Sequence, residues 1–175
     1  MGAAYVSSSM KILRRISFLF VLFLVPVSIA QRSTNGAGNE LHSKIRQLLD
    51  LYARKDVSGV MKLFADGNVL VMGSDLREVC TTREQAAELF RADFKLWDSS
   101  SFGNLGEIYS QANGDMVTAF FDVPFTFLRG ETKQSAVVRF ATVWRKSPQG
   151  LRLVQSMNTT PTVGQSAKEL STPRP

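Results

Sequence analysis

The chain has 175 residues, of which 44% are hydrophobic, 10% aromatic and 21% charged, and its formal net charge is +6. These proportions fit one globular domain, and they exclude a disordered chain, a collagen-like repeat and a protein with many membrane spans. One cysteine, Cys80, and one histidine, His42, are too few for an intramolecular disulfide or a cysteine-rich zinc site. Since no nucleotide-binding loop or nucleophile elbow is present either, we expect no metal and no cofactor.

The first 30 residues are typical of an export signal. Three basic residues precede an apolar stretch, and Ser28-Ile29-Ala30 supplies small side chains for cleavage after Ala30. Spanning a bilayer takes about 20 apolar residues, whereas residues 16–30 number only 15 and include Pro26. We therefore predict a cleaved signal peptide over 1–30 and a secreted or periplasmic protein, with an uncleaved membrane anchor as the alternative.

Cleavage changes the charge balance of the chain. The signal removes three of the 21 basic residues (Lys11, Arg14, Arg15) and none of the 15 acidic ones, so the net charge falls from +6 to +3. The remaining Lys and Arg are scattered singly among acids, so we expect no nucleic-acid partner. In an oxidising compartment a lone thiol is best explained as a buried small hydrophobe, which is our prediction for Cys80, with an intermolecular disulfide or a reactive thiol as alternatives. Translation starts at Met1 or at Met10.

Two helices are expected at the start of the mature chain. Residues 31–39 are polar and contain glycine, which predicts a flexible linker before an ordered region that starts near Glu40. A first amphipathic helix follows from one apolar stripe of helical spacing: Leu41, Ile45, Leu48, Leu49 and Tyr52. Asp56 then caps a second short helix that ends near Asp66-Gly67.

A strand and a third helix come next. The apolar run over 68–72 predicts a strand, and Gly73-Ser74-Asp75 begins a loop. Thr82 or Thr81 caps a helix that runs from Arg83 to about Trp97, because Ala86, Phe90, Phe94 and Trp97 recur at helical spacing.

The second half of the chain changes to the period of two that is typical of strands. We predict an antiparallel meander over residues 105–111, 116–128, 135–146 and 151–159, separated by turns that contain glycine. Pro124 cannot donate a ladder hydrogen bond, so it predicts a bulge or bend in the long second strand. Residues 163–175 are expected to form a flexible tail. No internal repeat or second domain is visible.

This order of elements describes an α+β domain whose sheet wraps around helices and leaves a cone-shaped cavity. The segments LLDLYARKDVSGVMKLFADGNVLVMGSD, TTREQAAELFRADF and FATVWRKSPQGLRLVQSMNTTP resemble SnoaL-like members of the nuclear transport factor two-like (NTF2-like) superfamily. The resemblance covers residues 40–162, and its most specific element is Tyr52-Ala53-x-x-Asp56 followed by Leu63-Phe64-Ala65-Asp66. It implies a cone-shaped NTF2-like fold with three N-terminal helices packed in a curved, mostly antiparallel sheet.

The superfamily contains isomerases, cyclases, dehydratases, protein-binding dimers and exported proteins without assigned activity, so the fold alone does not define a reaction. By alignment, the carboxylate base of the steroid isomerases falls on Met72, and their oxyanion-donating tyrosine falls on Leu48. Many SnoaL-like relatives end the last strand with a histidine, and that place is Met157 here. These departures count against an isomerase of that type.

Some polar residues remain candidates for acid–base chemistry. Asp75 and Glu78, on the loop after the first strand, are candidate general bases, and the alternative is that they are solvated loop carboxylates. Asp122 and Arg139 lie within apolar stretches of neighbouring strands. A cross-strand ion pair would explain both residues.

Large side chains could line the cavity for a hydrophobic ligand, although core packing would also explain each of them. They are Tyr52, Trp97, Phe121, Phe140, Trp144 and Met157. We expect a small apolar or amphipathic ligand in the cone of an exported homodimer. The alternatives are a lyase or isomerase that uses Asp75 or Glu78, and a dimeric protein-interaction module whose cone is filled by aromatic side chains. A shift of one residue in a strand would exchange the cavity and solvent faces.

Overall fold

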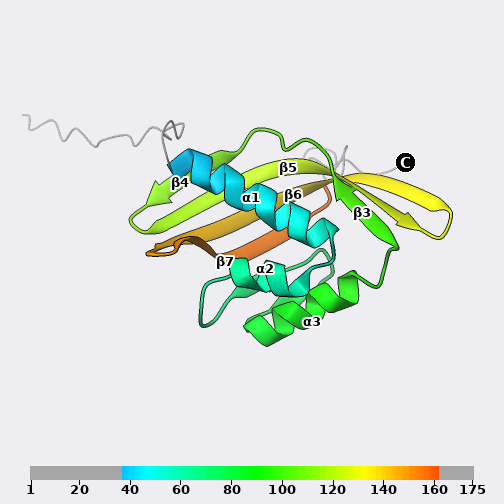
Figure 1. Cartoon of the computed structure of the whole chain (residues 1–175), viewed down its shortest axis with the longest axis horizontal. Coiled ribbons are helices and arrows are strands. Elements are labelled where there is room, and N and C mark those ends of the chain that lie inside the picture. The colour runs from blue at the N-terminus through cyan, green and yellow to red at the C-terminus, as the bar shows by residue number, and fades with distance from the viewer. Residues whose placement is uncertain (1–36, 162–175) are drawn as a thin grey trace, which may run out of the picture.

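The computed structural model describes residues 37–161, which form three helices and one curved, unclosed, mixed sheet of seven strands (Figure 1). The α+β class predicted from the sequence is confirmed. The helices are α1 (Ala37–Ala53), α2 (Val57–Leu63) and α3 (Arg83–Asp93). The strands are β1 (Leu70–Met72), β2 (Val79–Cys80), β3 (Ser99–Phe102), β4 (Tyr109–Asn113), β5 (Met116–Arg129), β6 (Thr132–Ser147) and β7 (Gly150–Thr159). The predicted signal peptide, residues 31–36 of the linker and the tail after residue 161 lie outside the described residues.

The first two helices begin and end for local reasons. Residues 37–39, expected in the linker, belong to α1. Asp56 caps α2 as predicted, since its carboxylate accepts a hydrogen bond from the Gly59 amide at 2.8 Å. The second helix ends at Leu63, earlier than predicted, because Phe64 is extended and pairs with Leu153 of β7.

The third helix is shorter than its hydrophobic pattern. Thr82, rather than Thr81, is the cap, and it forms a capping box with Gln85. The helix ends at Asp93 instead of near Trp97, and the chain then turns so that the Asp98 amide bonds to the Leu128 carbonyl at 2.8 Å. None of the helices within residues 37–161 is both long enough and apolar enough to cross a membrane.

The sheet has the strand order β2-β1-β7-β6-β5-β3, with β4 also paired to β5. The predicted antiparallel meander is confirmed for β4 to β7, whereas β1 pairs with β7 in parallel. The sequence prediction missed β2 and β3. The first has two residues, and the second is the serine-rich segment Ser99–Phe102, so neither shows a readable hydrophobic period.

No bulge occurs in the β5–β6 pairing at Pro124, so the bulge that was one of the two predicted features is absent. The β5–β6 register runs unbroken through Pro124 opposite Val137, and the irregularity lies between β6 and β7 at Val143/Trp144. The Gly103 amide donates to the Pro124 carbonyl at 2.8 Å, so this residue directs its backbone polar groups away from β6. The missing N–H therefore costs no β5–β6 hydrogen bond.

Side chains alternate between two faces along the long strands. The inner face, which packs against the helices, carries Phe121, Val123 and Phe125 of β5, and Phe121 lies opposite Phe140 of β6. Figure 1 shows α1 crossing the sheet, with α2 and α3 beside it. Residues with fully buried side chains form the core and include Ile45, Val60, Phe121, Val123, Thr142, Trp144 and Leu153.

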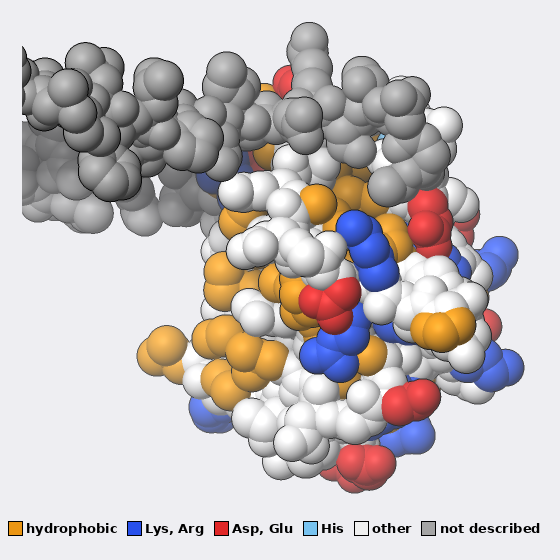
Figure 2. Space-filling view, turned by 90° about the vertical axis from the view of Figure 1, so that its left-hand side faces the viewer, with side chains coloured by type: hydrophobic (Ala, Val, Ile, Leu, Met, Phe, Trp, Pro, Cys, Tyr) orange, Lys and Arg blue, Asp and Glu red, His pale blue; other side chains and the backbone are white. Residues whose placement is uncertain are grey.

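The outer face carries a transverse row of apolar residues, here called the outer row. Each member lies opposite the next across six strands, in the order Tyr109, Phe120, Ala141, Met157, Met72 and Val79. Phe120 is 50% exposed and Met157 is 39% exposed. Figure 2 shows hydrophobic side chains gathered on the side of the molecule away from the helices. This face therefore presents apolar surface to solvent.

Candidate functional site

A cavity of about 240 Å³ lies between the inner face of the sheet, the end of α1 and the end of α3. Seven of its 18 lining residues are aromatic, and they come from α1, α3, the segment after α3, β3, β5 and β6: Tyr52, Phe90, Trp97, Phe102, Phe125, Phe127 and Phe140. The rings contact one another edge-on or tilted, with the centroids of Trp97 and Phe125 5.5 Å apart. Aromatic packing of this kind gives the cavity a rigid apolar wall.

One end of the cavity is polar. The Tyr52 hydroxyl, from α1, donates a hydrogen bond of 3.0 Å to Asp93 Oδ2, from the last residue of α3. Desolvation raises the pKa of Asp93 to about 6, aided by the negative charge of Glu78 and opposed by the hydrogen bond from Tyr52. Burial and the nearby Asp93 also raise the pKa of Tyr52, so its hydroxyl stays protonated and acts as the donor.

Glu78 reaches the same cavity because Gly73 leaves room for it. A Cβ atom on Gly73 would collide with the Glu78 carboxylate. The Asp75 amide donates to Glu78 Oε2 at 3.1 Å, and the Gly73 amide donates to the Glu78 carbonyl at 2.9 Å. This turn directs the Glu78 carboxylate to the cavity wall that also contains Asp93.

The structure divides the predicted site residues into two groups. Tyr52, Trp97, Phe140 and Glu78 line the cavity. Phe121, Trp144 and Met157 are not among its lining residues.

Each of these three residues has a different place in the fold. Phe121 stacks behind Phe140 with ring centroids 5.1 Å apart. Trp144 is fully buried in the core, where its Nε1 donates to Thr142 Oγ1 at 3.0 Å. Met157 belongs to the outer row, because its neighbour Asn158 takes the inward position of β7.

Asp75 lies outside the cavity. Its carboxylate forms an exposed ion pair of 3.0 Å with Arg77 Nε and also accepts a hydrogen bond from the Arg77 amide at 2.9 Å. These hydrogen bonds hold the pKa of Asp75 below its usual range. A solvated, ionised carboxylate that already has a cation partner is a poor general base.

Two further sequence predictions concern residues outside the cavity. The cross-strand ion pair between Asp122 and Arg139 is confirmed, because the residues lie directly opposite each other and form two hydrogen bonds of 2.8 Å on the outer face. Cys80 is a free, buried cysteine within the core, and desolvation raises the pKa of its thiol. Its prediction as a small buried hydrophobe is also confirmed.

The positions aligned with isomerase catalytic residues face away from the cavity or are buried. Met72 lies in the outer row, and the following residue, Gly73, lines the cavity. Leu48 is buried in the core. At both places the residue that lines the cavity is the one after the aligned residue, Gly73 after Met72 and Asn158 after Met157. Neither Gly73 nor Asn158 can act as a base.

Asp93 was missed by the sequence analysis. It lies three residues after Phe90 and four after Leu89, on the face of α3 that also carries the apolar stripe. A single acidic residue within a helical apolar stripe was the available signal.

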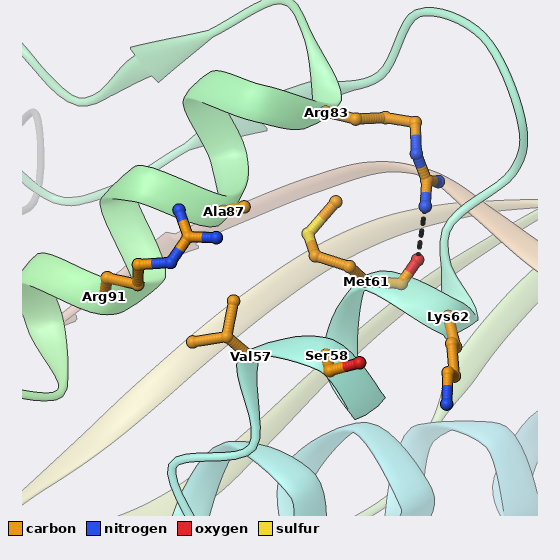
Figure 3. A pocket seen from close by; sticks show the side chains of 7 residues that line it. All are labelled: Val57, Ser58, Met61, Lys62, Arg83, Ala87 and Arg91. Atoms are coloured by element: carbon orange, nitrogen blue, oxygen red, sulfur yellow. Dashed lines mark hydrogen bonds between the residues drawn. The ribbon is translucent and has the colours of Figure 1, made fainter.

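A second hollow lies between α2 and α3 (Figure 3). Its basic side chains have a structural explanation in part. Arg83 donates to the carbonyls of Ala65 and Met61, and Arg152, which is not one of the lining residues, donates to the Lys62 carbonyl at 2.6 Å. These guanidinium groups satisfy carbonyls at the C-terminal end of α2, as expected for cations at that end of a helix.

Three helices and a curved sheet around an inner cavity define the NTF2-like fold. A model of the SnoaL-like domain matches residues 42–161, and the chain therefore belongs to the SnoaL-like domain family. No curated protein matches the chain.

Solved structures share this fold at low sequence identity. An NTF2-like superfamily protein from Salmonella enterica has a TM-score of 0.66 at 22% identity, over 74% of this chain and 96% of that one. A ketosteroid isomerase-like protein from Erwinia carotovora has a TM-score of 0.60 at 17% identity, over 73% and 98%. A protein of the NTF2-like family from Streptomyces avermitilis, provisionally named a dehydratase, has a TM-score of 0.64 at 13% identity, over 71% and 96%.

The half-buried charge of Asp93 should destabilise the fold. The pKa of Asp93 is raised from its usual value of 3.8 to about 6 in the folded state, so the protonated carboxyl group favours folding. This stabilisation is fully present below about pH 3.8 and is lost as the pH rises through about 6. We expect Asp93→Asn to raise the free energy of unfolding by about 1 kcal/mol near pH 8 and by less near pH 4, after allowance for partial exposure. Urea denaturation at both pH values measures this difference. Asp75→Asn is the matched control, and an equal gain from it would contradict the assignment.

Proposed function

We propose that this chain is an exported SnoaL-like protein that binds a small apolar or amphipathic molecule in the inner cavity. The observation that carries the proposal is the composition of the wall, in which aromatic rings surround a polar end made by Tyr52, Asp93 and Glu78. Binding sites for small molecules commonly combine an apolar lining with a few placed polar groups. The volume of about 240 Å³ suits a compact ligand.

Two other features support the proposal. The Nε1 atom of Trp97 is buried and has no hydrogen-bond partner among the described residues, and an unpaired buried donor is costly. A ligand that carries an acceptor beside the indole would satisfy it. Export is supported by the sequence pattern of residues 1–30, with its basic, apolar and small-residue regions.

Trp97 provides a direct test of binding. The chain has two tryptophans, and Trp144 is fully buried outside the cavity lining, so a ligand in the cavity should change the fluorescence of Trp97. We expect a saturable change with members of a panel of small apolar and amphipathic compounds, and no change in Trp97→Phe. Ala136→Leu, which fills the cavity, should weaken binding about tenfold or more through overpacking.

The matched control for Ala136→Leu is Ala141→Leu on the outer face of the same strand, which should leave the affinity unchanged. Native mass spectrometry of the mature chain, purified gently from its own compartment, would identify any bound compound. Absence of both a fluorescence response and a co-purified molecule would overturn the binding proposal.

A second candidate function is acid–base catalysis. It is favoured by one observation, that Asp93 lies in the cavity wall with a pKa of about 6 and a fixed hydrogen bond from Tyr52. A carboxyl group with a pKa near the working pH can exchange protons with a substrate in either direction. Of the two carboxylates predicted from the sequence, Glu78 lines the same cavity, whereas Asp75 does not.

Proton exchange would test this candidate. We expect carbonyl compounds with acidic α-hydrogens to exchange deuterium from D2O in the presence of the protein, with a rate that rises through about pH 6 as Asp93 ionises. Asp93→Asn should lower the rate by about 10²- to 10⁴-fold, while Asp75→Asn should leave it unchanged. NMR measures the exchange. A rate equal to that of buffer would exclude acid–base chemistry on these compounds.

We further propose that the protein forms a homodimer through the outer row. Six apolar residues in register across six strands give a continuous strip, of which Phe120, Met157 and Val79 are exposed at 39–50%. Exposed apolar strips of this extent on soluble proteins commonly mark protein contacts. The Asp122–Arg139 pair lies beside the strip and would contribute a polar rim.

Sedimentation velocity distinguishes the monomer from the dimer. We expect Phe120→Glu to weaken the dimer about 100-fold or more, because it would bury an unpaired charge in the contact. Leu76→Glu, at a fully exposed loop position, is the matched control and should sediment as the wild type does. A wild-type chain that is monomeric at all accessible concentrations would refute the dimer. A dimer that binds no small molecule would favour the protein-interaction alternative.

A further inference from the structure

The inner cavity has an unbalanced charge. Its charged lining residues are Glu78 and Asp93, and within residues 37–161 no lysine or arginine lines it. By contrast, two acidic residues outside the cavity are paired with arginine, Asp75 with Arg77 and Asp122 with Arg139. Two partly desolvated carboxylates without a counter-charge create a negative potential inside the cavity.

Both carboxylates retain unused acceptor capacity. One oxygen of Asp93 accepts from Tyr52, and one oxygen of Glu78 accepts from the Asp75 amide. No hydrogen bond within residues 37–161 reaches the other oxygen of either group. An ionised carboxylate offers about four acceptor sites, so a donor of positive charge would find several free lone pairs here.

The aromatic wall also attracts positively charged groups. Tyr52 lies within 6.1 Å of Trp97 and 5.8 Å of Phe102, measured between ring centroids, so several rings surround the polar end. Ring faces carry partial negative charge and attract organic cations, above all substituted ammonium groups. A metal ion is less suited to this site. No group of three or more His, Cys, Asp or Glu side chains that could hold one occurs within residues 37–161.

We propose that the cavity binds an organic amine in its ammonium form, with the head group between Asp93 and Glu78 and the apolar body against the aromatic wall. This inference rests on the proposed binding function and specifies the class of ligand. The carboxylates accept hydrogen bonds from the head group, and Tyr52 holds Asp93 in place from α1. The apolar body packs on Trp97 and Phe125.

Three probes that share one ring test the charge of the ligand. They are 2-phenylethylammonium, the neutral 2-phenylethanol and the anionic phenylacetate. We expect the ammonium to bind about tenfold or more tightly than the alcohol, and phenylacetate to bind most weakly, because hydrogen bonds between charged groups are the strong ones. Trp97 fluorescence and isothermal titration calorimetry measure the three affinities.

Substitutions then locate the preference. We expect Asp93→Asn to reduce the ammonium-to-alcohol ratio to about twofold or less, because the ammonium loses more than the alcohol when the charge is removed. Glu78→Gln should reduce the ratio in part. Asp75→Asn removes a carboxylate of the same loop outside the cavity and should have no effect. Circular dichroism melting curves check that each variant is folded.

The pH dependence of binding gives an independent readout. The groups that face Asp93 are Tyr52 from α1 and Glu78 from the loop before β2, and the sheet contributes uncharged residues to the lining. Because the probe amine, like lysine, stays protonated below about pH 10, the titrating group is Asp93. Ammonium affinity should therefore rise between about pH 5 and pH 8, and the affinity for the alcohol should not.

The outcomes separate this inference from the proposed function. If the alcohol binds as tightly as the ammonium, the ammonium inference is overturned while the binding function stands. If phenylacetate binds best, the ligand is an anion and the inference is equally wrong. If none of the three probes binds and no compound of the wider panel does, the binding function itself fails.

Discussion

The alternation of side chains along the paired strands β5 and β6 is the constraint on which the rest of the structure depends. Fourteen residue pairs run in unbroken antiparallel register from Met116 opposite Arg145 to Arg129 opposite Thr132. In such a ladder successive side chains must point to opposite faces. Phe120 and Phe121 therefore share one chemistry but not one role, since Phe120 joins the outer row and Phe121 the core. The cavity and the outer apolar strip are two consequences of the same register.

The acidic residues show how environment decides the role of a carboxyl group. Asp75 and Asp122 are solvated and paired with arginine, and in both cases the hydrogen bonds lower the pKa. Asp93 has no such cation and is partly desolvated at the cavity wall, which raises its pKa. A carboxyl group that is held where its charged form is disfavoured is a candidate for function, because packing alone would favour a neutral residue at that position.

The junction between the first two helices positions the polar end of the cavity. Lys55 has a φ of 59°, a left-handed conformation that usually favours glycine. Its amide bonds to the Tyr52 carbonyl at 2.9 Å and the Asp56 amide bonds to the Leu51 carbonyl at 3.0 Å, which closes the end of α1. The Lys55 ammonium group in turn donates to the Trp97 carbonyl. One strained residue thus links the helix that carries Tyr52 to the segment that carries Trp97.

The sequence by itself determined the elements that depend on local chemistry. Asp56 and Thr82 cap their helices through amides three residues away, and glycine turns separate the strands of the meander, so both could be read from neighbouring residues. The strand parity, the shortened α3 and the meeting of Tyr52 with Asp93 could not. Tyr52 and Asp93 are 41 residues apart, and only the packing of α1 against the end of α3 brings them together. Strand parity, which decides which alternate residues face the cavity, likewise depends on how the whole sheet packs against the helices. A difference of one residue places Asn158 in the cavity and Met157 on the outer face.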